Sequence, residues 1–348
     1  MANCLVANPS NLFAYLQLLN QATHQVNTPI YLINKYLNMK QLLLCISLII
    51  VFKVYSQDEQ VIINTPKKEE GTATKVFYGQ KLINTKSVQV LSKGILEFNV
   101  AHSFDDVGGN RGGAKNFFGL DNSTDIRIGF QLGLSDKVNL VVARAKGYDV
   151  RQQYEMGLKW QLLKQMDNDP QHPVSLTVYV NDVVSAMKSS GVSGTQNDFK
   201  KLGDRHSQVV QLLLARKMGN VSLQFNPLYL HTNLVEPIDQ ENIFALGGAI
   251  RVPLSKKIIL LADYFHPFRS SETKDAYELQ GIKFYDPIGV GFEIVTEGHV
   301  FHLNFTNAYE ILENRFIRRT DRNWGDWEFR WAFNLSRNFV VFKNKKNN

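Results

Sequence analysis

Ten charged residues occupy the polar positions of segments in which polar and apolar side chains alternate. They are six acids and four bases: Glu97, Asp125, Glu155, Asp263, Glu293, Glu328, Arg127, Lys159, Arg251 and Arg330. Successive side chains of a β-strand point to opposite faces, so these charges would share one face of each strand. Because an isolated ion is costly in a low-dielectric interior, charges of both signs on one face indicate ion-paired struts. The alternative is a polar path for small solutes, slightly favouring cations.

The histidine and serine residues give no catalytic arrangement. Ser103 follows His102 directly, but adjacent strand residues face opposite sides and do not meet. His302 shares its face with Asn304, whose amide would orient the imidazole, but that face is expected to be the polar one. A lipid hydrolase would need such a set with a serine on the lipid face. We therefore expect no enzyme activity, no cofactor and no metal, with a lipid-acting barrel enzyme as an alternative.

The segment 104–121 is rich in glycine and aspartate. Its glycine pairs permit positive φ, and Asp105, Asp106 and Asp121 would offer oxygen ligands to a hard cation such as Ca²⁺. The glycine spacing does not match a phosphate-binding loop, and no Lys-Ser/Thr pair follows. A loop folded into the barrel, or a surface turn, is the favoured role.

The alternation that places these residues recurs about a dozen times. In 327–335, for example, the large apolar side chains Trp327, Phe329, Trp331 and Phe333 stand at every second position. The other segments are 96–101, 126–133, 137–146, 154–160, 174–181, 208–216, 220–229, 243–252, 257–265, 288–296 and 300–307. Strands that are apolar on one face and polar on the other are typical of barrels with lipid outside and water inside. We predict an antiparallel transmembrane β-barrel of about twelve strands.

The lengths of the connections support this fold independently. Short polar turns near 135–137, 218–220, 254–256 and 297–299, and a somewhat longer one near 164–173, alternate with stretches at 105–123, 183–206, 231–242, 267–287 and 308–324. Short periplasmic turns and longer extracellular loops are typical of outer-membrane barrels. A secreted, soluble β-sandwich is the other reading of the alternation, but it gives no reason for this regularity.

Aromatic and glycine positions refine the prediction. Aromatic residues gather near strand ends and fit interfacial girdles: Trp160, Tyr179, Tyr229, Tyr264, Phe265, Trp324, Trp327 and Trp331. Glycines recur at polar-face positions: Gly129, Gly133, Gly157, Gly247 and Gly291. Because glycine leaves room for neighbouring side chains, this pattern favours a narrow or plugged lumen over an open pore.

The N-terminal region divides into three parts. The apolar run Leu42–Phe52, preceded by Met39-Lys40, is typical of a signal peptide over 39–56, with cleavage between Ser56 and Gln57. Residues 1–38 carry no acid and are interpreted as a non-native upstream extension, with Met39 as the true initiator. Residues 57–93 are polar and are interpreted as a periplasmic lead-in or a segment lying against the barrel. The barrel is expected over 94–342, followed by a polar tail, 343–348.

Composition excludes several function classes. Both cysteines, Cys4 and Cys45, lie in the part expected to be removed, which leaves no thiol for catalysis, disulfides or metal binding. Of the 39 lysines and arginines three precede residue 57, which leaves 36 bases against 32 acids in the mature chain. This balance is too weak for a nucleic-acid partner.

A family resemblance rests on five motifs. They are Ser87–Gly94, Leu96-Glu97-Phe98, His102-Ser103-Phe104, Asn116–Asp121 and Asp125–Phe130. With them the chain resembles an uncharacterised family of bacteroidete-type outer-membrane β-barrel proteins, a domain of unknown function. The likeness covers roughly 75–340 and is most specific in its first hundred residues. It implies a barrel and an outer-membrane location, but no substrate or active residue. The polar tail after Phe342 departs from the aromatic terminus that barrels often carry.

Together these observations predict a bacterial outer-membrane protein that contacts lipid and is either a narrow channel for small solutes or a structural barrel. Neither the solute nor the state of the lumen, open or plugged, follows from the sequence.

Overall fold

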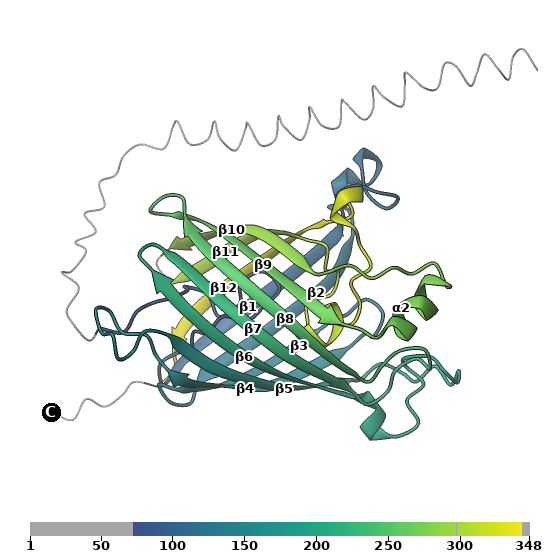
Figure 1. Ribbon diagram of the computed structural model, residues 1–348, viewed down its shortest axis with the longest axis horizontal. Coiled ribbons are helices and arrows are strands. Elements are labelled where there is room, and N and C mark those ends of the chain that lie inside the picture. The colour runs from purple at the N-terminus through teal and green to yellow at the C-terminus, as the bar shows by residue number, and fades with distance from the viewer. Residues whose placement is uncertain (1–71, 297, 343–348) are drawn as a thin grey trace, which may run out of the picture. The chain divides into compact units, whose positions relative to one another are not determined.

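The computed structural model describes residues 72–296 and 298–342 of the chain. Over these residues twelve antiparallel strands close into a barrel, which confirms the predicted fold (Figure 1). Each strand pairs with its neighbours in sequence, and β12 pairs with β1 to close the sheet. The strands are β1 Ile95–Asp106, β2 Ser123–Gly133, β3 Val138–Ala145, β4 Gln153–Leu163, β5 Ser175–Ser185, β6 His206–Met218, β7 Val221–Thr232, β8 Asn242–Pro253, β9 Ile258–Phe268, β10 Ile288–Thr296, β11 His299–Thr306 and β12 Arg330–Val340.

The two ends of the barrel differ, as the connection lengths predict. At one end, here named the turn end, strands join through short turns, and β1 starts there while β12 ends there. At the other, the loop end, the long connections carry the short helices (Figure 1). These helices are η1 Ala114–Gly119, η2 Leu202–Arg205, α2 Ser271–Glu278, α3 Glu313–Phe316 and η3 Trp324–Asp326. No helix among the described residues is long and apolar enough to span a membrane.

The outer wall is apolar and the inner wall largely polar. Along β4, for instance, Met156 and Trp160 are exposed, with exposed fractions of 63% and 55%, whereas Glu155 and Lys159 are buried inside the barrel. Such strands place their apolar side chains outward because the interior is already filled by polar groups that bond one another. This arrangement is the one expected for contact with lipid.

Residues 72–93, here named the plug, lie inside the barrel rather than outside it, which corrects the described part of the predicted periplasmic lead-in. The plug enters and leaves at the turn end, where Thr74 N donates to Gln165 O (2.9 Å) and Lys93 N donates to Asp136 Oδ1 (2.9 Å). Between these points it forms a hairpin, closed where Leu82 N donates to Thr85 O (2.8 Å). Residues 79–88 are all buried.

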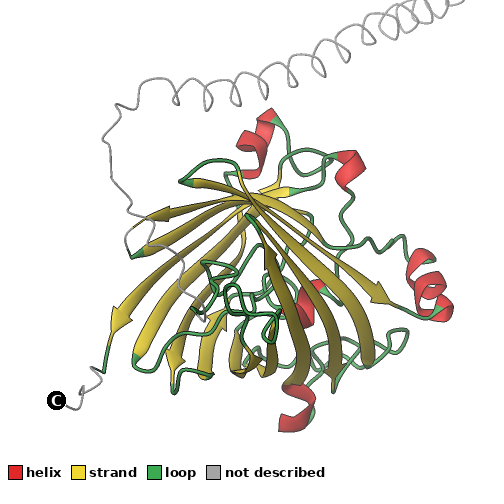
Figure 2. Ribbon diagram, turned by 60° about the vertical axis from the view of Figure 1, so that its left-hand side comes forward, coloured by secondary structure: helices red, strands yellow, loops and turns green. Residues whose placement is uncertain are grey.

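A second segment enters from the loop end. Residues 307–329, here named the inner loop, connect β11 to β12 and bury most of 308–320, including α3. The Phe316 ring packs against that of Phe265 on β9, with ring centroids 5.4 Å apart. Figure 2 shows loop segments inside the ring of strands, as expected for a lumen filled from both ends.

Two details of the sequence interpretation need correction. The last strand begins at Arg330, because Trp327 adopts a left-handed backbone (φ 61°) that ends the preceding turn. Tyr179 and Phe265 are fully buried inside the barrel and are not part of an interfacial girdle. Glycine makes room for both: a Cβ at Gly247 would lie 2.3 Å from the Phe265 ring, and one at Gly157 would lie 3.0 Å from that of Tyr179.

The predictions for residues 1–38, the signal peptide over 39–56 with its Ser56–Gln57 cleavage point, and the tail 343–348 lie outside the described residues.

Candidate functional site: the filled lumen

The structure places nine of the ten charged residues singled out by the sequence inside the barrel and one outside the strands. Nine are buried inside the barrel, whereas Glu328 lies in the inner loop, where its carboxylate accepts from Asn323 N (3.1 Å). The physical reason is that β12 starts only at Arg330, so the alternation at Trp327-Glu328-Phe329 does not correspond to a strand. Arg330 itself points inward and pairs with Asp106.

A chain of ion pairs crosses the middle of the lumen. Arg127 Nη2 on β2 lies 2.6 Å from Glu155 Oε2 on β4. Lys86 of the plug lies 3.1 Å from Glu155 Oε1 and 3.1 Å from Glu313 Oε1 of the inner loop. Tyr179 also donates its hydroxyl proton to Glu155. Buried pairs of this kind offset their desolvation only when every partner is present, so this chain ties both inserted segments to the wall.

Other inward charges also contact the plug. The Asp263 carboxylate accepts from the backbone N–H groups of Asn84 (2.6 Å) and Thr85 (3.0 Å). Glu293 pairs with Arg251 (3.4 Å) and with His302 Nε2 (3.1 Å). Asp263 therefore bonds the plug to the wall, whereas Glu293 joins β10 to β8 and β11 within the wall itself.

Neutral wall side chains bond to the plug backbone. Gln224 accepts from Val88 N (2.7 Å) and donates to Lys86 O (2.9 Å). Asn139 bonds both N and O of Leu91, at 2.7 and 3.0 Å. Similar bonds to plug carbonyls come from Ser222, Thr177 and Asn334. The backbone groups of this buried segment, which belongs to no strand, are thus satisfied by amides and hydroxyls of the wall.

The two sides of the plug face different walls. Apolar plug residues pack against inward apolar residues of β3, β5, β6, β8 and β9 in one buried cluster, to which the plug contributes Val76, Phe77, Leu82, Ile83 and Val88. On the side of β1, β2 and β12 polar and apolar contacts mix, and two small cavities of about 20 and 10 Å³ remain. Glu97, Asn99 and Arg127 line the first, Ser103 and Asn334 line the second, and Lys81 of the plug lines both.

A known protein family matches most of the chain. The model of the family described as "Membrane bound beta barrel domain (DUF5777)" matches residues 77–339. The chain belongs to this family. The match confirms the predicted membership of a membrane β-barrel family of unknown function, and it includes most of the plug as well as the strands.

Solved structures resemble this chain in fold alone. The KdgM porin is 8% identical, with a TM-score of 0.42, and covers 70% of this chain and 99% of its own. The NanC porin is 6% identical, with a TM-score of 0.39, and the match covers 71% of this chain and 99% of the porin. An outer membrane channel from Pseudomonas putida F1 is 10% identical, with a TM-score of 0.44, and covers 74% and 100%. No curated protein matches the chain.

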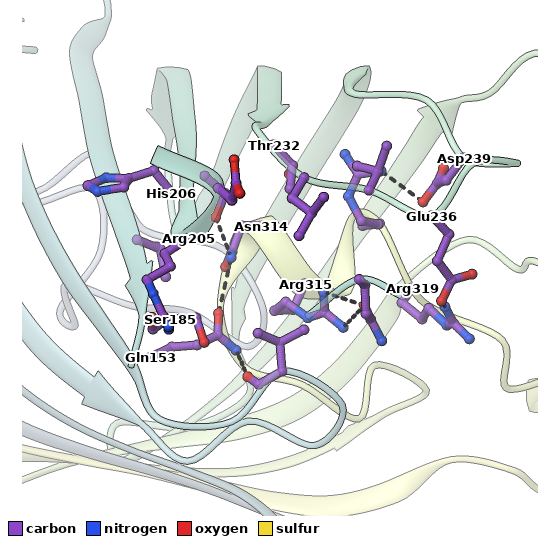
Figure 3. Close-up of a pocket in the computed structure, with 18 of the residues that line it drawn as sticks. Gln153, Ser185, Arg205, His206, Thr232, Glu236, Asp239, Asn314, Arg315 and Arg319 are labelled. Carbon is purple, nitrogen blue, oxygen red and sulfur yellow. Dashed lines mark hydrogen bonds and ion pairs between the residues drawn. The ribbon is translucent and has the colours of Figure 1, made fainter. Parts of the chain in front are cut away.

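The loop end holds a further cavity of about 40 Å³ between the inner loop and the β5–β6 and β7–β8 connections (Figure 3). Arg315 Nε lies 2.9 Å from Glu310 Oε2, and Arg318 Nη1 lies 2.9 Å from Asp239 Oδ2. Burial raises the pKa of Glu310, and Arg315 opposes this shift. Burial likewise lowers the pKa of Arg318 against the opposing effect of Asp239. The charges here are held close together away from water.

Other candidate groups stand apart from any such cluster. Ser103 is buried inside the wall while His102 on the outer face stacks on Phe333, so the two do not meet. Asp106 pairs with Arg330, and Asp105 lies 3.9 Å from Arg111. Among the described residues no group of three or more His, Cys, Asp or Glu is placed to hold a metal ion.

Sequence reasoning missed both inserted segments. The plug carries seven valine, leucine, isoleucine or phenylalanine residues and four lysines among otherwise mostly polar residues, a pattern too irregular for strand or helix periodicity. The inner loop had a clearer signal: Leu312, Phe316 and Ile317 follow helical spacing, and Glu310, Glu313, Arg315, Arg318 and Arg319 concentrate charge in one loop.

Proposed function

We propose that the protein is a bacterial outer-membrane channel with a narrow path for small polar solutes along β1, between the plug and the wall. The family match supports a membrane barrel, and the apolar outer wall suits contact with outer-membrane lipid. The signal peptide expected over 39–56 would direct export, and the turn end would then face the periplasm.

The two cavities beside β1 carry this proposal. They share Lys81, and their linings follow β1 from Glu97 to Ser103, so they succeed one another along the barrel wall. Both are lined by polar and apolar side chains in similar measure, and each is about the size of one water molecule. Small shifts of Lys81 would join them, whereas the opposite side of the plug is sealed by apolar packing.

Serine-to-cysteine exchange on the two sides tests the path. In a C4S/C45S background, Ser103→Cys places a thiol beside the path and Ser222→Cys places one behind the plug, where Ser222 donates to Val76 O (2.6 Å). Refolded protein in planar bilayers is expected to conduct small ions. A small cationic methanethiosulfonate reagent is expected to block S103C and leave S222C conducting.

Two results would refute the channel. One is the absence of conductance for any ion or small solute in wild-type and both variants. The other is equal block of S103C and S222C, which would show that solutes do not follow β1.

A purely structural barrel is the second candidate, and one observation favours it. Five apolar side chains of the plug lie in one buried cluster, each contributing roughly 1.5–3 kcal/mol on burial, so the lumen resists opening. A non-conducting but stably folded protein would support this function.

A further inference from the structure

The 40 Å³ cavity at the loop end is separate from the path beside β1. It lies among the inner loop and the connections 186–205 and 233–241, and has room for about three water molecules or one solute of similar size. Figure 3 shows Arg319 of the inner loop beside Glu236 of the β7–β8 connection.

Positive charge predominates in its lining. Four arginines line the cavity, Arg205, Arg315, Arg318 and Arg319. Of the three lining acids, Asp204 accepts from its neighbours Lys200 N (2.9 Å) and Lys201 N (3.0 Å), so its carboxylate is engaged in its own turn. Asp239 faces Arg318 and Glu236 faces Arg319, while Glu310 and Asp149, which lie outside the lining, pair with Arg315.

Several polar atoms of this lining lack partners. Arg318 Nε, Thr232 Oγ1 and Asn314 Oδ1 are buried and hydrogen-bond to nothing among the described residues, and Arg319 Nε, also without a hydrogen bond, lies 3.8 Å from Asp149 Oδ2. Arg318 is 3% exposed and Asn314 is 5% exposed. Leaving such groups unsatisfied is unfavourable, and native proteins rarely do so. Three of the four can donate a proton, so a matching ligand is rich in acceptor oxygens.

We propose that this cavity binds a small solute bearing a carboxylate, about the size of acetate. Guanidinium N–H groups form short, charge-assisted bonds with carboxylate oxygens, and the Thr232 hydroxyl would donate a third bond. The site rests on the proposed channel only for its biological role, which would be to collect solute at the loop end. Binding itself needs only the cavity.

The site is adjacent to the plug contact. Asn314 lines the cavity, and the preceding residue, Glu313, holds Lys86 of the plug. Both belong to α3, so a ligand that stabilises α3 also stabilises the contact between the inner loop and the plug. An occupied cavity is therefore expected to slow exchange of the plug amides.

Calorimetric titration of the refolded full chain with sodium acetate tests the site. Saturable binding of acetate is expected, with none of acetamide, its neutral isostere, at matched ionic strength. Arg318→Lys keeps the charge that faces Asp239 but removes Nε, and should weaken acetate binding roughly tenfold. Thr232→Val should weaken it less. The matched control Arg216→Lys, on the outer wall, should bind acetate as the wild type does.

Three outcomes would overturn the site: no acetate binding, equal binding of acetate and acetamide, or equal affinity of R318K and R216K. The first would show that acetate does not bind, the second that the carboxylate charge is not recognised, and the third that Arg318 Nε does not contact the ligand. Acetate binding by a protein that does not conduct would refute the channel and leave the site standing.

Discussion

The plug and the inner loop both fill the lumen, but the wall holds them in different ways. The plug is bonded mainly through its backbone, by neutral or charged side chains of the strands such as Gln224, Asn139 and Asp263. The inner loop is held through its own charged side chains, among them Arg315, which lies 3.6 Å from Asp149, and Arg318, which lies 2.9 Å from Asp239. Each also contributes to its own apolar cluster.

This difference separates two kinds of specificity. A segment bonded through its backbone tolerates side-chain replacement, because the bonding groups belong to every residue. A segment bonded through long charged side chains depends on their identity and, near solvent, on ionic strength. We therefore expect the plug to behave as a fixed filling and the inner loop as the part that responds to ligands and salt.

Lys86 is the exception within the plug, and its replacement should have the largest effect. Lys86→Met removes the cation between Glu155 and Glu313, which leaves the buried Glu313 carboxylate without its ion pair. Breaking a buried pair in this way costs about 3–5 kcal/mol. The apparent unfolding midpoint in urea should fall accordingly, measured with the barrel reconstituted in vesicles.

The double variant K86M/E313Q provides the control for this effect. Removing both charges should recover a large part of the lost stability, since a neutral amide is cheaper to bury than a carboxylate. If K86M alone unfolds at the wild-type midpoint, the ion-pair chain does not join the two segments.

Asp263→Asn should have the next largest effect. Both plug N–H groups donate to Asp263 Oδ2, so an amide oxygen can still accept from them. Both nevertheless lose a charged partner, and the new amide NH₂ meets the Nδ2 donor of Asn84, at a cost of about 2 kcal/mol. Asn84→Ala, which deletes the side-chain bond to the same carboxylate (2.9 Å) and the one from Thr306 Oγ1 (3.1 Å), should cost about 1–1.5 kcal/mol.

Hydrogen exchange of the peptide covering 79–88 distinguishes the two variants. Faster exchange in D263N than in N84A is expected, because only the former weakens the bonds to the backbone. The reverse order would mean that plug side chains, rather than its backbone, hold it in place.

How far the sequence predicts this molecule follows from the range of each interaction. All twelve strands among the described residues follow from alternation and turn lengths, which are local properties of the chain. The inward positions of Glu155 and Lys159 follow in the same way. Partners do not: Lys86 and Glu313 are 227 residues apart, and nothing local links them.

The errors have the same origin. The pattern at Trp327-Glu328-Phe329 alternates as a strand does, but the left-handed backbone at Trp327 interrupts it. Tyr179 lies near the middle of β5 at a polar-face position, and only the room left by Gly157 on β4 allows its ring to turn inward. Tertiary contacts therefore determine where the last strand begins and which way Tyr179 points, and the local sequence pattern does not.

The smallest effect on stability is expected at the rim of the inner loop, where the ion pairs are most sensitive to salt. Arg319 lies 3.6 Å from Glu236 and 3.8 Å from Asp149, and its side chain is partly exposed. Arg319→Gln should cost less than about 1 kcal/mol at low ionic strength, because such pairs are weak and solvent-screened. At about 1 M NaCl the Debye length falls to about 3 Å, and the difference from wild type should vanish. The loss in K86M should persist at both salt concentrations, since its charges are buried. Equal salt sensitivity of the two variants would show that the plug and the inner loop are held by the same kind of interaction.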